Sequence, residues 1–151
     1  QPSYSILNRW IERDGLKDTL TDLGVGAIAF VPLAQGILTG KYLNGIPAGS
    51  RASQGKSLDP ASITPRAIES VRALNQIAQA RGQTLAQMAL AWVLRDTAIT
   101  SALIGASRPE QVADCAGAVA NLEFSAEELA RIDAIAEEKD LNLWARSSEG
   151  V

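Results

Sequence analysis

The sequence predicts an α/β fold in which short buried strands alternate with helices. Two apolar runs, at residues 25–31 and 99–104, are short, nearly continuous and bounded by Gly or Pro. Such runs are typical of parallel strands that are buried on both faces. Residues 1–5 are interpreted as the last part of a third strand, and amphipathic helical patterns lie between and after these segments.

The helix boundaries are signalled by capping residues. Thr64 followed by Pro65 is an N-cap with a first-turn proline, and Gly82 is a typical helix stop. Capping-box patterns, whose side chains satisfy free backbone N–H groups, occur at residues 84–87, 107–110 and 125–128. The predicted helices are 16–23, 65–81, 85–94, 109–121 and 126–139.

Composition excludes several classes of function. The 151 residues are 46% hydrophobic and 21% charged, and no apolar run is long enough for a membrane span. A net charge of −3 without a basic stripe argues against nucleic-acid binding. The chain has no histidine, which excludes His-based zinc sites and Ser-His-Asp triads within it. The single cysteine, Cys115, cannot form an intramolecular disulfide, so a cytoplasmic location is predicted.

The strand count predicts an incomplete domain. Three strands cannot close a β/α barrel, which needs eight units, and an open doubly wound sheet would normally carry more strands than these. The chain opens at Gln1 and its only methionine is Met88, so we expect it to be a fragment.

Two strand ends have properties of phosphate sites. The long segment 32–64 follows the first strand, with Gly36 and Gly40 permitting close backbone approach and Lys41 supplying a cation. The second strand runs through Ser107 and Arg108 into a helix N-terminus, which favours an anion. Taken alone, the first segment could also be an ordinary structural loop, and the second an ordinary capped helix start without a ligand.

Four motifs in order along the chain resemble those of the aldo-keto reductases. They are Gln-x-x-Tyr-Ser at 1–5, Pro-Leu-Ala-x-Gly-x-Leu-Thr-Gly-Lys-Tyr at 32–42, Gly-Ile-Pro-x-x-Ser-Arg at 45–51 and Ile-Gly-Ala-Ser-x-x-Glu-Gln at 104–111. The likeness is greatest to the branch with bacterial glyceraldehyde-3-phosphate-type reductases and potassium-channel β subunits. It implies a (β/α)8 TIM barrel, of which residues 1–151 would be the C-terminal portion, about the last three β/α units, with the N-terminal half absent.

The resemblance implies an NADPH site and places its parts on individual residues. Gln1 matches the residue that binds the nicotinamide carboxamide and Phe30 the ring that stacks on nicotinamide; otherwise they would be a solvated strand end and a core aromatic. The positions that match the pyrophosphate-binding stretch are Val31, Pro32, Leu33, Ala34, Gln35, Lys41 and Arg51. Those that match the surroundings of the adenosine and its 2′-phosphate are Gly105, Ser107, Gln111 and Asp114.

One position departs from the family pattern. Cys115 stands where related reductases commonly carry an asparagine that holds the adenine, which puts that contact in question. Arg51 and Arg108 favour NADPH over NADH because they can neutralise a 2′-phosphate, the alternative being ordinary surface charge.

The resemblance further implies that the intact protein reduces a small carbonyl substrate with hydride from NADPH. The family's catalytic Tyr, Lys, Asp and His are expected on the N-terminal half, which would be this chain's partner, so the chain alone should be inactive. Tyr4 and Tyr42 lack the family's catalytic surroundings. A non-catalytic NADPH-binding regulatory module and an unrelated structural α/β domain are the alternatives.

The tryptophans suggest different roles. Trp92 lies on an apolar helix face and is expected in the core. Trp144 belongs to a C-terminal tail that the resemblance would bring toward the active-site mouth, as a substrate contact. Residues 137–140 read as a solvated helix end.

Overall fold

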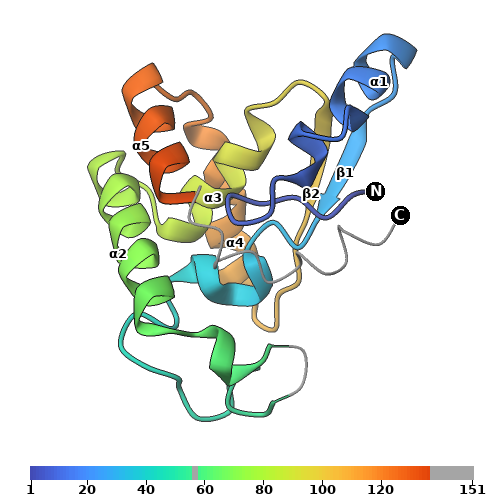
Figure 1. Ribbon diagram of the computed structural model, residues 1–151. Coiled ribbons are helices and arrows are strands. Elements are labelled where there is room, and N and C mark those ends of the chain that lie inside the picture. The colour runs from blue at the N-terminus through green and yellow to red at the C-terminus, as the bar shows by residue number, and fades with distance from the viewer. Residues whose placement is uncertain (56–57, 137–151) are drawn as a thin grey trace.

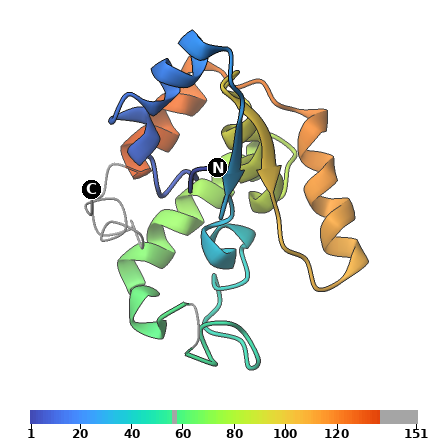
Figure 2. The same cartoon turned by 90° about the vertical axis from the view of Figure 1, so that its right-hand side faces the viewer.

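The computed structural model describes residues 1–55 and 58–136. Two parallel strands, β1 (Ala27–Phe30) and β2 (Ile99–Leu103), pair directly with each other. Most of the helices lie on one side of this pair, as Figures 1 and 2 show from two directions. These are α1 (Leu16–Leu23), α2 (Pro65–Ala80), α3 (Leu85–Leu94), α4 (Pro109–Ala116) and α5 (Ala126–Ala136). Short 3-10 helices are η1 (Trp10–Glu12), η2 (Ala34–Thr39), η3 (Pro60–Ser62) and η4 (Gly117–Ala120).

The two central strands are confirmed, whereas the third is reduced to a single bridge. Ser3 pairs with Phe30 in parallel, and Phe30 pairs with Leu103 on its other side. The expected burial of both sheet faces is wrong for this chain: Ala27 and Ala29 are buried, but Ile28 is 47% exposed and Leu103 52% exposed. In the described residues the helices cover one face only, so the alternate side chains remain open to solvent.

Helix α3 lies at the centre of the hydrophobic core. Thr84 and Gln87 make the expected capping box at its N-terminus, with 3.0 and 3.1 Å hydrogen bonds in the two directions. Most of its side chains are buried, including Trp92, which has no exposed surface, as predicted. Helix α2 begins at the predicted cap, where Thr64 Oγ1 accepts from the Ala67 amide at 3.1 Å. It packs the buried Val71, Leu74 and Ile77 inward, so α2 and α3 share one apolar layer.

The N-terminal cap and the end of the helix expected at 109–121 differ from the predictions. The helix expected at 109–121 is divided, because α4 ends at Ala116 and η4 continues as tighter 3-10 turns. The capping box expected at 107–110 is wrong, since Gln111 accepts from the Ser107 and Arg108 amides instead. The box at Ser125 and Glu128 is confirmed by 2.7 and 3.1 Å hydrogen bonds. Residues 137–140 and Trp144 lie outside the described residues.

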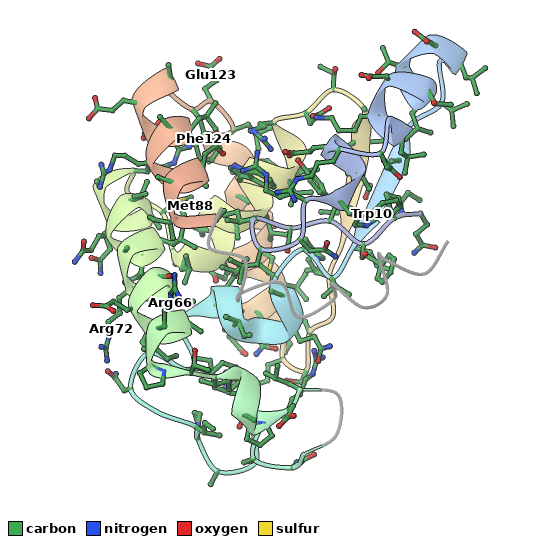
Figure 3. All side chains as sticks on the ribbon, viewed as in Figure 1. Trp10, Arg66, Arg72, Met88, Glu123 and Phe124 are labelled. Atoms are coloured by element: carbon green, nitrogen blue, oxygen red, sulfur yellow. The ribbon has the colours of Figure 1, made fainter. Side chains whose placement is uncertain are left out.

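Helix α5 is held to the end of α2 by a buried arginine. The Arg81 guanidinium donates to Glu128 at 2.8 Å and lies 3.6 Å from the ring centre of Phe124, which Figure 3 labels beside α5. Its side chain is only 3% exposed, so the ion pair and the ring stabilise a charge withdrawn from water. Within residues 1–55 and 58–136, no helix is both long and apolar enough to cross a bilayer.

Candidate functional site

The segments that carry most of the predicted cofactor residues leave the sheet at one end. Strands β1 and β2 are parallel, so the chain emerges from both at their shared carboxyl end. Figures 1 and 2 show η2 and the loop that leads to α4 at this end, with α1 at the other. Ligands of parallel α/β folds bind at the carboxyl ends of the strands.

The turn directly after β1 has an unusual backbone. Val31, Ala34 and Gln35 have φ angles of 57°, 47° and 56°, in the left-handed region that non-glycine residues rarely adopt. The turn is closed by hydrogen bonds from the Ala34 amide to the Val31 carbonyl, at 3.0 Å, and from the Gly36 amide to the Leu33 carbonyl, at 2.9 Å. Backbone strain of this kind is concentrated at ligand-binding sites.

Most side chains of this turn pack into the core, but one polar side chain is buried without a hydrogen-bond partner. Pro32 and Ala34 are buried and Leu33 packs against the core, so these residues offer mainly backbone to a ligand. The Gln35 Oε1 atom is buried and accepts no hydrogen bond from the described residues. A buried acceptor without a partner costs free energy, which a donor group on a ligand would recover.

The N-terminal segment lies alongside the end of β1. Phe30 donates its amide to the Pro2 carbonyl at 3.0 Å, and its carbonyl accepts from the Tyr4 amide at 3.2 Å. Gln1 is exposed next to this pairing and Phe30 is half-buried. The two residues expected at the nicotinamide therefore lie on adjacent segments of the chain, Gln1 beside the residues that pair with Phe30.

The N-terminus of α4 is organised by Gln111. Its Oε1 accepts from the Ser107 amide at 2.8 Å, from the Arg108 amide at 3.2 Å and from Ser107 Oγ at 3.2 Å. An open groove of about 680 Å³ is lined here by residues that include Ser107, Arg108 and Val112. An anion at these amides would take the place of the Gln111 oxygen.

The basic residues of the proposed site are solvent-accessible. Lys41 and Arg51 are exposed on the segment that follows η2, and Arg108 is exposed at the start of α4. Gly105 is exposed at the end of β2. These positions are open to an anionic ligand, as charge-assisted phosphate contacts require.

Asp114 and Cys115 lie further along α4, on its side toward α3. The Asp114 carboxylate accepts from Gln87 Nε2 at 3.0 Å and from Thr84 Oγ1 at 3.2 Å. Cys115 lines a smaller cavity of about 290 Å³ with Leu90 and Ser101. Burial, together with the charge of Asp114, raises the pKa of the Cys115 thiol, so the thiol stays protonated and weakly reactive.

Neither tyrosine presents its ring to solvent. Tyr4 is fully buried; its hydroxyl donates to Glu12 Oε1 and accepts from Arg95 at 3.3 Å. Burial raises the pKa of Tyr4 well above its usual value, with the Glu12 hydrogen bond adding to the effect, which is unsuitable for a proton donor near neutral pH. Tyr42 is 1% exposed.

Sequence reasoning missed a polar cluster around Glu12. Arg9 donates to Glu12 at 2.8 Å and to Asp133 of α5 at 2.7 Å, while the Arg95 guanidinium lies 3.8 Å from the Trp92 ring centre. The members are far apart in sequence, and no local pattern connects them. In the described part of the chain, no group of three Cys, Asp or Glu side chains is arranged to hold a metal ion.

Comparison with known sequences shows similarity to one family. Residues 1–137 match the model of the aldo/keto reductase family. L-glyceraldehyde 3-phosphate reductase of Escherichia coli K12 is 54% identical over 153 residues, covering 99% of this chain and 44% of that protein. A putative voltage-gated potassium channel subunit beta of Schizosaccharomyces pombe is 39% identical, covering 89% of this chain and 41% of that protein. The chain thus spans less than half the length of these relatives.

Two solved structures are similar to this chain in fold. The glycerol dehydrogenase of Gluconobacter oxydans superposes with a TM-score of 0.74 at 25% identity, covering 93% of this chain and 42% of that one. A thermostable aldo-keto reductase has a TM-score of 0.61 at 25% identity, over 88% of this chain.

Proposed function

Because this chain belongs to the aldo/keto reductase family, we propose that the intact protein reduces small aldehydes or ketones to alcohols with NADPH. This chain would supply much of the cofactor site. The observation that carries the proposal is the strained turn at Val31, Ala34 and Gln35, which lies at the carboxyl end of β1 in a chain that is 54% identical to an aldehyde-phosphate reductase. That likeness favours a small, phosphorylated aldehyde as substrate.

The residues present fit a dinucleotide in three parts. The turn after β1, with Lys41, would hold the pyrophosphate through backbone and charge, and Arg51 would neutralise the 2′-phosphate. Gln1, beside the residues that pair with the end of β1, and Phe30 would hold the nicotinamide. Ser107 and the start of α4 would hold the adenosine and 2′-phosphate. NADPH supplies the hydride when bound, while these residues orient the ring and neutralise the phosphates.

The remaining part of the barrel would cover the open sheet face. Ile28 and Leu103 present apolar surface at the centre of the sheet. We propose that this face packs against the N-terminal half of the barrel, which would also supply the catalytic residues. The chain of residues 1–151 on its own should then associate or aggregate. A monodisperse monomer in sedimentation, with cooperative unfolding in calorimetry, would contradict the partial-barrel interpretation.

A second candidate function is a non-catalytic NADPH-binding regulatory module. The 39% identity to a putative channel β subunit favours it. Such a module would bind NADPH tightly but oxidise it no faster in the presence of carbonyl compounds.

The direct experiment measures NADPH oxidation by the intact protein with a panel of small aldehydes, including glyceraldehyde 3-phosphate. Aldehyde-dependent oxidation supports the reductase. Binding of NADPH without turnover across the panel supports the regulatory module, and absence of both contradicts the two functions together.

A further inference from the structure

The helix that carries the adenosine end of the proposed site has little apolar anchorage of its own. None of the residues of α4 is fully buried, and Val112 is 51% exposed. Most helices of globular proteins are oriented by an apolar face packed on the core. The orientation of α4 must therefore depend strongly on other contacts, and its polar contacts with α3 are the most specific of these.

Those contacts converge on the side-chain amide of Gln87. Its Nε2 donates to both the carbonyl oxygen and the Oδ1 of Asp114, each at 3.0 Å. Its Oε1 accepts from the Thr84 amide, and Thr84 Oγ1 donates to the Asp114 carboxylate at 3.2 Å. The capping box of α3 is thus extended to α4, and the full hydrogen-bonding capacity of the Nε2 group is used.

The Gln87 amide lies close against the backbone of Gly117. A Cβ atom at Gly117, just after α4, would lie 2.5 Å from Gln87 Nε2. The backbone of Gly117 is helical, with φ of −61°, so alanine would be accepted there apart from this clash. The absence of a side chain at Gly117 lets the Gln87 amide approach Asp114.

We propose that Gln87 is a positioning residue that sets the adenosine end of the cofactor site by holding α4 through Asp114. This proposal rests on the proposed function, because it assumes that the N-terminus of α4 binds the nucleotide. Gln87 is not among the residues proposed to contact the cofactor. Its loss should therefore affect the adenosine half of the cofactor and spare the nicotinamide half, which lies on β1 and the N-terminal segment.

The test compares Gln87→Glu with Gln76→Glu in the intact protein. Both variants add one negative charge, but Gln76 is exposed on α2, away from this contact. Gln87→Glu keeps the oxygen that caps α3, removes both donors and places a carboxylate against Asp114. We expect the Kd for adenosine 2′,5′-bisphosphate to rise about tenfold, with a change below about twofold for reduced nicotinamide mononucleotide. Equal losses for both fragments, or equal behaviour of the two variants, would overturn the proposal.

A second variant keeps the proposal testable if Gln87→Glu folds poorly. Gly117→Ala should weaken adenosine 2′,5′-bisphosphate binding by displacing the Gln87 amide. In a Gln87→Ala background the same substitution should have no further effect, because no amide remains to be displaced. An effect of equal size in both backgrounds would contradict the role of Gln87.

Hydrogen exchange separates this proposal from the proposed function. If the wild-type protein binds neither fragment, the proposed function fails, and the contact is then judged by exchange of the amides of residues 111–117. Faster exchange in Gln87→Glu than in Gln76→Glu supports a positioning role for Gln87, and equal exchange overturns it.

Discussion

The amide of Phe30 donates a 3.0 Å hydrogen bond to the carbonyl of Pro2, which places the end of β1 beside the N-terminal segment. This pairing brings Gln1 and Phe30, 29 positions apart in the sequence, to adjacent segments at the end of β1. Because the pairing uses backbone groups only, the Phe30 side chain can be changed without breaking it.

Phe30→Ala should lower turnover while the adenosine end of the cofactor still binds. Stacking contributes about 0.5–1.5 kcal/mol beyond area burial, so kcat should fall by about three- to tenfold for a misplaced nicotinamide. Steady-state kinetics and adenosine 2′,5′-bisphosphate titration check this. Leu23→Ala, which truncates an exposed apolar side chain of α1 at the other end of the sheet, is the matched control. If the folded fraction of Phe30→Ala has normal kinetics, Phe30 is a core residue only.

Arg51→Ala should weaken the binding of NADPH far more than the binding of NADH. The loss of a charge-assisted phosphate contact costs about 1.5–3 kcal/mol, which corresponds to a Kd about 10- to 150-fold higher for NADPH. Fluorescence titration of both cofactors measures the difference. Arg13→Ala, which removes an exposed arginine near α1 at the other end of the sheet, should leave both affinities unchanged. Equal weakening of NADPH and NADH by Arg51→Ala would remove Arg51 from the 2′-phosphate site.

Gln35→Gly should weaken the binding of NADPH without lowering the free energy of unfolding. Gln35 has φ of 56°, where a residue with a side chain has a strain of about 1–2 kcal/mol and glycine has none. The greater freedom of glycine in the unfolded chain offsets part of this gain. We expect the free energy of unfolding to be unchanged or raised by up to about 1 kcal/mol, measured by urea denaturation. Gln76→Gly, at an exposed position inside α2, should instead lower it by about 1 kcal/mol. A comparable loss at Gln35 would show that its side chain stabilises the turn.

Glu12→Gln should remove a contribution to the free energy of unfolding that depends on pH. Burial acts to raise the pKa of Glu12, but hydrogen bonds from Arg9 and Tyr4 and the nearby arginine charges hold this pKa below its usual value. The unfolded chain, with a Glu pKa of about 4.3, therefore binds the proton more readily than the native state. The contribution of Glu12 is complete above that pH and is lost as the pH falls through the lower native pKa.

Urea denaturation between pH 3 and 7 measures this contribution. The wild type should exceed Glu12→Gln by about 1–3 kcal/mol at pH 7, and the difference should shrink in acid. Glu69→Gln, on the exposed face of α2, should differ little from the wild type at any pH. A Glu12→Gln difference that is constant with pH would contradict the assigned ionisation.

The sequence predicted those parts of the fold that local chemistry determines. Thr64, Thr84 and Ser125 signalled helix starts because capping hydrogen bonds join residues three positions apart. The division of the last turns at Ala116 and the exposure of Ile28 were not predicted, since both depend on what packs against the segment. Local patterns contain no information about those neighbours.

The strand-end location of candidate residues could be predicted from the sequence, but the contacts between them could not. The strand-end location of Val31 and Ser107 followed from the order of strands and motifs. The left-handed backbone of Val31 did not, because valine is unfavourable there and tertiary structure imposes it. The contact of Gln87 with Asp114 joins residues 27 positions apart, so the capping-box pattern alone could not reveal its second role.

Hydrogen–deuterium exchange of the intact protein with and without NADPH shows most directly whether this chain forms the cofactor site. We expect NADPH to slow exchange in residues 31–36, after β1, and in residues 105–115, around the start of α4. Exchange in α2, whose exposed face is away from the proposed site, should not change. Protection confined to other segments, or no protection at saturating NADPH, would show that the cofactor binds elsewhere or not at all.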